Sequence, residues 1–179
     1  MLKTLQNAFK IKEIRDKLLF TFFMLVVIRI GSQLPIPGVN TRFFEELFSR
    51  QANDAFGFFN TITGGSFTNM SVFALSITPY ITSSIIMQLL TIAIRKLEEM
   101  HRDGADGRKK IAEYTRYLTV ALALLQSIAM AVGFGGRGLL IDFTPLNVIV
   151  VVVTMTAGSA MLMWIGERIA EHGVGNGIS

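Results

Sequence analysis

Residues 55–94 read AFGFFNTITGGSFTNMSVFALSITPYITSSIIMQLLTIAI, which is 40 consecutive positions without a charged side chain. A transmembrane helix needs about 20 apolar residues, so this run is too long for one span and too short for two spans with an ordinary loop. Gly64-Gly65 divides the run, and residues 70–94 are long enough to cross a membrane. We therefore expect a short half-helix that re-enters the membrane from outside, a break at Gly64-Gly65 and then a full span. The alternative is an apolar external loop packed on a helical bundle.

The composition of the whole chain also indicates a membrane protein. Hydrophobic residues make up 51% of the 179 positions and charged residues only 17%, and the mean hydropathy is +0.49. These values exclude a disordered chain and argue against a soluble globule. Further apolar runs predict spans over 18–34, 117–134 and 148–166. The expected fold class is therefore an all-α membrane protein with four transmembrane helices and the re-entrant half-helix.

The basic residues predict the orientation of these spans. Of the 17 Lys and Arg, five lie in residues 1–17 and seven in residues 95–116. With these segments in the cytosol, 13 Lys and Arg lie inside and three outside, so the N terminus is expected in the cytosol. The same clustering between apolar runs argues against a nucleic-acid partner for the net charge of +4.

The predicted segments follow from the spans and this orientation. Residues 1–17 either form an amphipathic helix on anionic lipids of the inner leaflet or serve only as a topology anchor. The tail at 167–179 ends as though the chain were cut off before its next element. The expected order is a cytosolic segment 1–17, a first span 18–34, an external segment 35–69 containing the half-helix, a second span 70–94, a cytosolic loop 95–116, a third span 117–134, an external loop 135–147, a fourth span 148–166 and a cytosolic tail 167–179.

Several kinds of chemistry lack their residues in this sequence. The chain has no cysteine, which excludes disulfides, thiolate nucleophiles and iron–sulfur clusters on cysteine. No Asp or Glu lies in the apolar part of a predicted span, and His101 and His172 fall in cytosolic segments. The sequence contains no GxxxxGK[ST], HExxH or GxSxG motif. We expect a protein that is not an enzyme and needs no cofactor or metal.

The second predicted span carries two kinds of surface. Ile77, Ile81 and Ile85 recur every fourth residue and form one apolar stripe, and Pro79 is expected to permit a kink. An isoleucine stripe commonly serves lipid contact or core packing, and lining a pore is the rarer use. The polar complement is Thr78, Tyr80, Thr82, Ser83, Ser84 and Gln88.

Four stretches of this sequence resemble the SecY family of bacterial protein-translocation channels. They occur in the family's order and are spread over almost the whole chain. The stretches are Gly64–Phe67 with Val72–Leu90, Arg29–Ser32 with Pro35–Gly38, Gly107–Tyr117, and Trp164–Arg168 with Gly173–Ser179.

The resemblance implies a fold and a set of site residues. The family has ten spans in two inverted halves, and this chain resembles the first four. Residues 53–69 correspond to the plug, with Phe56, Phe58, Phe59, Ile62, Gly64 and Gly65. Ile77, Ile81 and Ile85 correspond to the hydrophobic pore ring. The lateral gate, where signal peptides dock, corresponds to the other side of the same helix with Thr82, Ile86 and Leu89, and to Gln126.

The resemblance also implies partners and a location. Those partners are the small membrane subunits SecE and SecG, the motor ATPase SecA, the ribosome with its nascent chain, signal peptides, unfolded secretory proteins and anionic lipids. The expected location is the bacterial plasma membrane. Two other readings of the residues stay open: a small-solute transporter, since broken helices also mark transporters, and a membrane scaffold that presents the loop 95–116 to a soluble partner.

Overall fold

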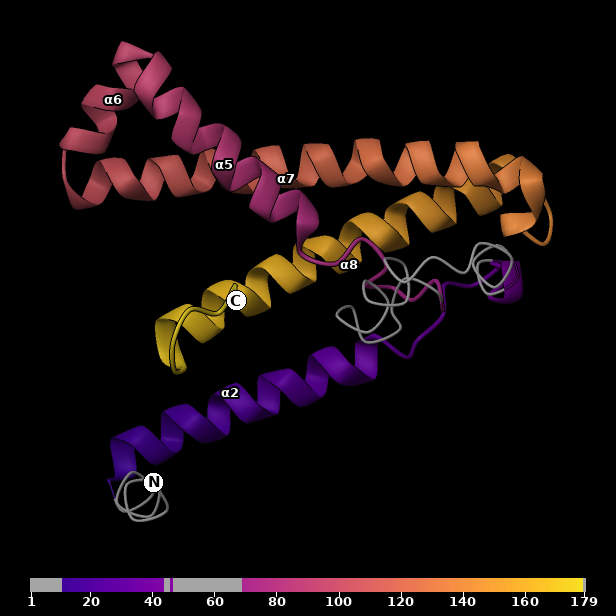
Figure 1. The fold of residues 1–179 in the computed structure, drawn as a ribbon, viewed down its shortest axis with the longest axis horizontal. Coiled ribbons are helices and arrows are strands. Elements are labelled where there is room, and N and C mark those ends of the chain that lie inside the picture. The colour runs from indigo at the N-terminus through magenta and orange to yellow at the C-terminus, as the bar shows by residue number, and fades with distance from the viewer. Residues whose placement is uncertain (1–10, 44–45, 47–68, 179) are drawn as a thin grey trace.

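The computed structural model describes residues 11–43, 46 and 69–178, and this part of the chain is helical without a named strand. Figure 1 shows α7 and α8 running side by side, with α5 crossing α7 and α2 lying along the other side of α8. The helices are α2 (Lys12–Gly31), α5 (Thr78–Ala93), α6 (Arg95–Arg102), α7 (Ala105–Phe134), the short helical turn η1 (Gly135–Leu139) and α8 (Pro145–His172).

Two helices in the described part are long and apolar enough to cross a membrane. They are α7 together with η1, over Ala105–Leu139, and α8, over Pro145–His172. The helix α5 is also apolar but shorter, at 16 residues. These lengths agree with a membrane protein of helical class.

Small side chains bring α7 and α8 together. Buried small residues recur at every fourth position of α7, so that one face of the helix can approach its neighbours closely. The buried hydroxyls of this face are satisfied by carbonyls one turn earlier, and Ser127 also reaches Thr156 of α8 at 3.2 Å. Polar residues in an apolar helix are thus accommodated without unpaired groups. The face consists of Thr115, Thr119, Ala123, Ser127 and Ala131.

Three loops pair with one another at the end of α7 where η1 lies. The amide of Ile36 donates to the carbonyl of Met70 at 3.0 Å, and the amide of Asn40 donates to Leu139 at 2.8 Å. Gly38 has a φ of +80°, which an L side chain rarely adopts, and this turn lets the loop meet both partners. The loops and α8 enclose a shared core of Ile36, Val39, Met70, Ala74, Ala131, Leu139, Leu140, Val151, Val152 and Met155.

The start of α5 differs from the expected span over residues 70–94. The helix begins at Thr78, and Pro79 lies in its first turn, where a missing amide costs no helical hydrogen bond. Pro79 therefore starts the helix and does not kink it. Ser71 forms an isolated bridge with Pro35, residues 72–77 form turns, and Met70 and Ser76 have positive φ values.

The charged segment 95–116, predicted only as a loop, is largely helical. It holds α6 and the first turns of α7, joined at Gly104, which has a φ of +81°. A Cβ at Gly107 would collide with the carbonyl oxygen of Met100, so α6 and α7 cross closely at this glycine. The tail also folds back, since the amide of Val174 donates to Thr21 of α2 at 3.0 Å.

Candidate functional site

The helix α5 is anchored to the bundle by one narrow face. Pro79, Ser83 and Met87 are buried, and they recur every fourth residue on the side that packs against α7. The Ser83 hydroxyl donates to the carbonyl of Pro79 at 2.7 Å, which satisfies its polar group inside the contact. The rest of the helix surface is left for other contacts.

An apolar stripe runs along the opposite face of α5. The exposed fractions are 42% for Ile81, 52% for Ile85, 61% for Leu89 and 80% for Ile92. Spacings of four, four and three residues keep these side chains on one side of a helix with 3.6 residues per turn. We call these four residues the apolar stripe.

The predicted pore-ring residues do not all occupy the same position. Ile81 and Ile85 lie on the apolar stripe, whereas Ile77 is the residue just before α5 and is half-buried. A Cβ placed on Gly166 of α8 would lie 3.4 Å from Cδ1 of Ile77, so Ile77 rests against α8.

The predicted gate residues divide as well. Thr82 and Ile86 are half-buried at the flank of α5, and the Thr82 hydroxyl donates to Thr78 at 3.0 Å. Leu89 is exposed. It lies about one turn from Ile85 and seven residues, or close to two whole turns, from Thr82, so it borders both the apolar stripe and the side that holds Thr82 and Ile86. Gln126 is half-buried on α7.

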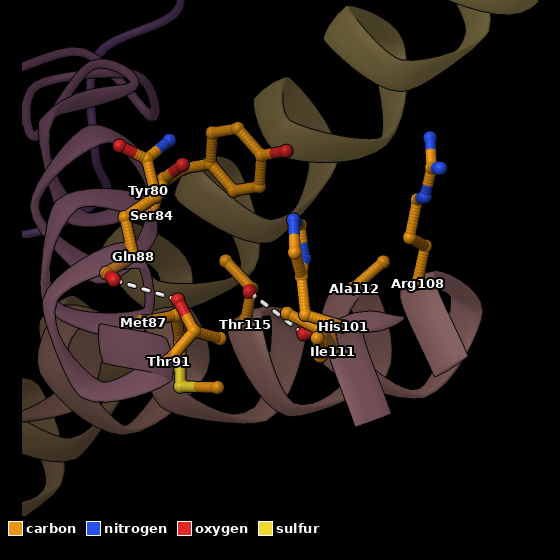
Figure 2. Close-up of a pocket in the computed structure, with 10 residues that line it drawn as sticks. All are labelled: Tyr80, Ser84, Met87, Gln88, Thr91, His101, Arg108, Ile111, Ala112 and Thr115. Carbon is orange, nitrogen blue, oxygen red and sulfur yellow. Dashed lines mark hydrogen bonds between the residues drawn. The ribbon is translucent and has the colours of Figure 1, made fainter. Parts of the chain in front are cut away.

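A polar stripe lies beside the apolar one and was not predicted as a site. Tyr80, Ser84, Gln88 and Thr91 follow the same four-four-three spacing, one residue earlier along α5. They line a cavity of about 270 Å³ between α5, α6 and α7. Figure 2 shows the α5 side chains across this space from His101 of α6. The remaining lining residues are Met87, Arg108, Ile111, Ala112 and Thr115.

An ion pair joins two helices near this cavity. Nε of Arg116 on α7 donates to Oε1 of Glu167 on α8 at 2.8 Å, 51 positions apart in sequence. Glu167 is only 20% exposed, while Arg116 is 46% exposed. The pair therefore ties α7 to α8 next to Gly166, the residue behind Ile77. Among the described residues, no cluster of three His, Asp or Glu side chains could hold a metal ion.

The family model for SecY matches residues 71–179, which is more than half of the chain. The chain belongs to the SecY family. The resemblance seen in the sequence is thereby confirmed, and the match includes α5 with both of its stripes.

Named SecY proteins align with the entire chain. The protein translocase subunit SecY of Bacillus licheniformis is 44% identical over 183 aligned residues, and that of Halalkalibacterium halodurans is 45% identical over 182. Each alignment covers 100% of this chain and 42% of the relative. The chain thus spans about two fifths of the length of these SecY proteins.

Solved SecY-type structures share the fold of this chain. A structure titled "Sec61 in the Canine ribosome-channel complex from the endoplasmic reticulum" superposes with a TM-score of 0.65 at 24% identity, covering 92% of this chain and 34% of that one. A structure titled "The plug domain of the SecY protein stablizes the closed state of the translocation channel and maintains a membrane seal" gives a TM-score of 0.63 at 23% identity and covers 92% and 33%. At these identities the comparison shows the fold.

The SecY plug predicted at residues 53–69 lies outside the described residues, apart from Asn69. The six plug residues named from sequence all fall in the undescribed part, as do residues 1–10 of the predicted amphipathic segment. The site described for this SecY chain is therefore α5 and its supports on α7 and α8.

Proposed function

We propose that this chain is the N-terminal part of the pore-forming subunit of a protein-conducting channel. The channel translocates unfolded secretory proteins across the bacterial plasma membrane and releases apolar helices sideways into lipid. The chain is not an enzyme. The observation that carries the proposal is the surface of α5, where an exposed apolar stripe runs beside a polar stripe that lines the cavity toward α6 and α7.

The chemistry of the apolar stripe suits a seal around a moving polypeptide. Ile81 and Ile85 offer branched apolar side chains that contact a passing chain without forming hydrogen bonds to it. A narrow apolar constriction also excludes water and ions when no chain is present. Ile77 completes this ring from the end of α5, and residues 53–69 supply the plug on the external side.

A path for a polypeptide across the membrane needs more helices than the structure describes. In this proposal α2, α5, α7 and α8 are four spans of a ten-span channel, with the N terminus in the cytosol. Leu89, Thr82, Ile86 and Gln126 face the lateral gate and contact the apolar helix of a signal peptide. SecE, SecG, SecA and the translating ribosome are the partners that complete and drive the channel.

Site-specific photocrosslinking tests the proposal directly. A photoreactive residue replaces Ile81 in a full-length SecY protein containing this segment, and a stalled secretory nascent chain is the target. The matched control is a probe at Ile128 of α7, which has nearly the same exposure, 41% against 42%. We expect a crosslink from position 81 that requires a functional signal sequence, and none from position 128.

Two results would overturn the proposal. The first is silence at position 81 with confirmed insertion and a working probe. The second is equal crosslinking from both positions, because that would mean generic apolar contact. Silence would reopen the membrane scaffold, and solute uptake by liposomes holding the complete complex would reopen the small-solute transporter.

A further inference from the structure

The segment before α5 rests on α8 at three successive points. A Cβ at Gly158 would collide with the carbonyl oxygen of Val72, so the two backbones touch at this glycine. One residue on, the Ser159 hydroxyl donates to the carbonyl of Ser76 at 3.4 Å. Two turns further along, Gly166 lies against the Cδ1 atom of Ile77. One face of α8 thus follows residues 72–77 up to the first turn of α5.

The supported segment cannot hold its shape through local structure alone. It is irregular, and Ser76 has a φ of +53°, a left-handed conformation that costs a non-glycine residue of order 1–3 kcal/mol. Such a conformation persists only where the surroundings fix it. The surroundings here are α8 and the amide of Ser76 itself, which donates to Phe73 at 2.8 Å.

The position of α8 is itself fixed next to Ile77. Glu167 follows Gly166 directly, and its ion pair with Arg116 joins α8 to α7, the helix on which α5 packs. The three helices α5, α7 and α8 therefore meet close to Ile77. A shift of α8 at this point would move the Ile77 side chain relative to Ile81.

We propose that α8 sets the position of the pore ring, with Gly158, Ser159 and Gly166 as positioning residues for Ile77. This inference rests on the proposed function, because it takes Ile77 as a ring residue. Gly158 is required because the backbone carbonyl of Val72 occupies the space that a side chain would fill, and Gly166 leaves room for the Ile77 side chain and the Gly177 carbonyl. Adding a methyl group there displaces the segment and loosens the closed ring.

The test measures resting ion conductance of full-length SecY complexes in planar bilayers without a substrate. The principal variant is Gly158→Ala, and the matched control is Gly133→Ala, a helical glycine of α7 with no neighbour within 4 Å of an added Cβ. We expect Gly158→Ala to raise the open fraction about fivefold, equivalent to about 1 kcal/mol, and Gly133→Ala to match wild type. Equal conductance of the two variants would overturn the inference.

Two further measurements separate positioning from simple loss of fold. Ser159→Ala adds no volume and removes the hydrogen bond to Ser76. It therefore tests the positioning role of α8 even if the Gly158→Ala protein is not stably produced. Gly166→Ala places a Cβ 3.4 Å from Cδ1 of Ile77 and 3.2 Å from the Gly177 carbonyl oxygen, and the substitution Ile77→Val removes the Cδ1 atom. We expect the Gly166→Ala and Ile77→Val double variant to conduct less than Gly166→Ala alone. A double variant that leaks as much as Gly166→Ala, or a tight Ser159→Ala variant, contradicts the inference.

Failure of this inference is distinguishable from failure of the channel proposal. Ile81→Asn serves as the positive control for leakage, and the crosslink from position 81 reports the polypeptide path. If both behave as expected while the α8 variants match Gly133→Ala, the channel proposal stands and the positioning role of α8 is wrong. If Ile81→Asn and the crosslink also fail, the channel proposal itself is wrong.

Discussion

The ion pair between Arg116 and Glu167 should contribute measurably to the stability of the helix bundle. Exposed ion pairs contribute about 0–1 kcal/mol, whereas hydrogen bonds to charged groups contribute about 1.5–3 kcal/mol. This pair lies between the two classes, since Glu167 is 20% exposed and the N–O distance is 2.8 Å, but Arg116 is 46% exposed. We expect a coupling free energy of about 1 kcal/mol.

A double-mutant cycle measures this coupling. Arg116→Gln, Glu167→Gln and the double variant are made in full-length SecY, and each is unfolded reversibly in mixed micelles of SDS and a mild detergent. Arg116→Gln should lower the free energy of unfolding by about 1–2 kcal/mol, because it leaves the largely buried Glu167 without its charged partner. Glu167→Gln should cost about 1 kcal/mol or less, because the Arg116 that it leaves is 46% exposed. The double variant should lose less than the sum of the singles.

The control is a second ion pair on the same protein. Arg102 and Glu98 are 2.7 Å apart within α6, but their side chains are 77% and 44% exposed. This pair joins residues of one helix and should show a coupling below about 0.5 kcal/mol. A coupling for Arg116 and Glu167 no larger than that of the control would refute the argument that partial burial strengthens the pair.

Two more predictions concern packing. Met155 of α8 is 0% exposed in the core shared with the loops, so Met155→Ala should lower the free energy of unfolding by about 2 kcal/mol or more. The control is Met161→Ala, at a 45% exposed position. It should change the free energy of unfolding by less than about 0.5 kcal/mol in the same micelle assay. Gly107→Ala should separate α6 from α7, because its Cβ would meet the Met100 carbonyl. The rate of amide hydrogen exchange in α6 should then rise relative to the Gly133→Ala control. Unchanged exchange would contradict the close crossing of the two helices.

The sequence could predict the long helices and the family, because those depend on local signals. α8 is apolar over many turns, which marks a spanning segment without tertiary information. The SecY motifs are contiguous stretches, so they are visible before any fold is known. Helical spacing alone also places Leu89 one turn from Ile85 and two turns from Thr82, so the sequence could show that it borders both the apolar stripe and the predicted gate side.

The start of α5 could not be predicted from local signals. A proline in an apolar run is compatible with a kink or with a first turn. The choice at Pro79 is made by remote contacts, since the amide of Val72 donates to the carbonyl of Leu34, and α8 packs on the same segment. Pairing between segments so distant in sequence leaves no periodic pattern to read.

The polar cavity also could not be predicted from sequence, because contacts between different helices form it. Tyr80, Ser84 and Gln88 were visible as polar positions, but their meaning required α6 to fold back so that His101 could face them. The helical character of α6 had a local signal in the spacing of Glu98 and Arg102, which pair one turn apart. The direction of α6 relative to α5 had no local sequence signal, because the turn at Gly104 and the close crossing of α6 and α7 at Gly107 set it.

The two stripes of α5 constrain the surroundings that this helix needs. Lipid satisfies exposed side chains such as Leu89 and Ile92, since a bilayer interior is as apolar as they are. Lipid does not satisfy the hydroxyl and amide groups of Ser84 and Gln88, which lie only one residue away around the helix. A helix with these adjoining faces is stable where lipid or apolar protein meets a watery space. In this chain the polar stripe faces the cavity toward α6 and α7, and the apolar stripe beside it is exposed, so α5 lies at such a boundary.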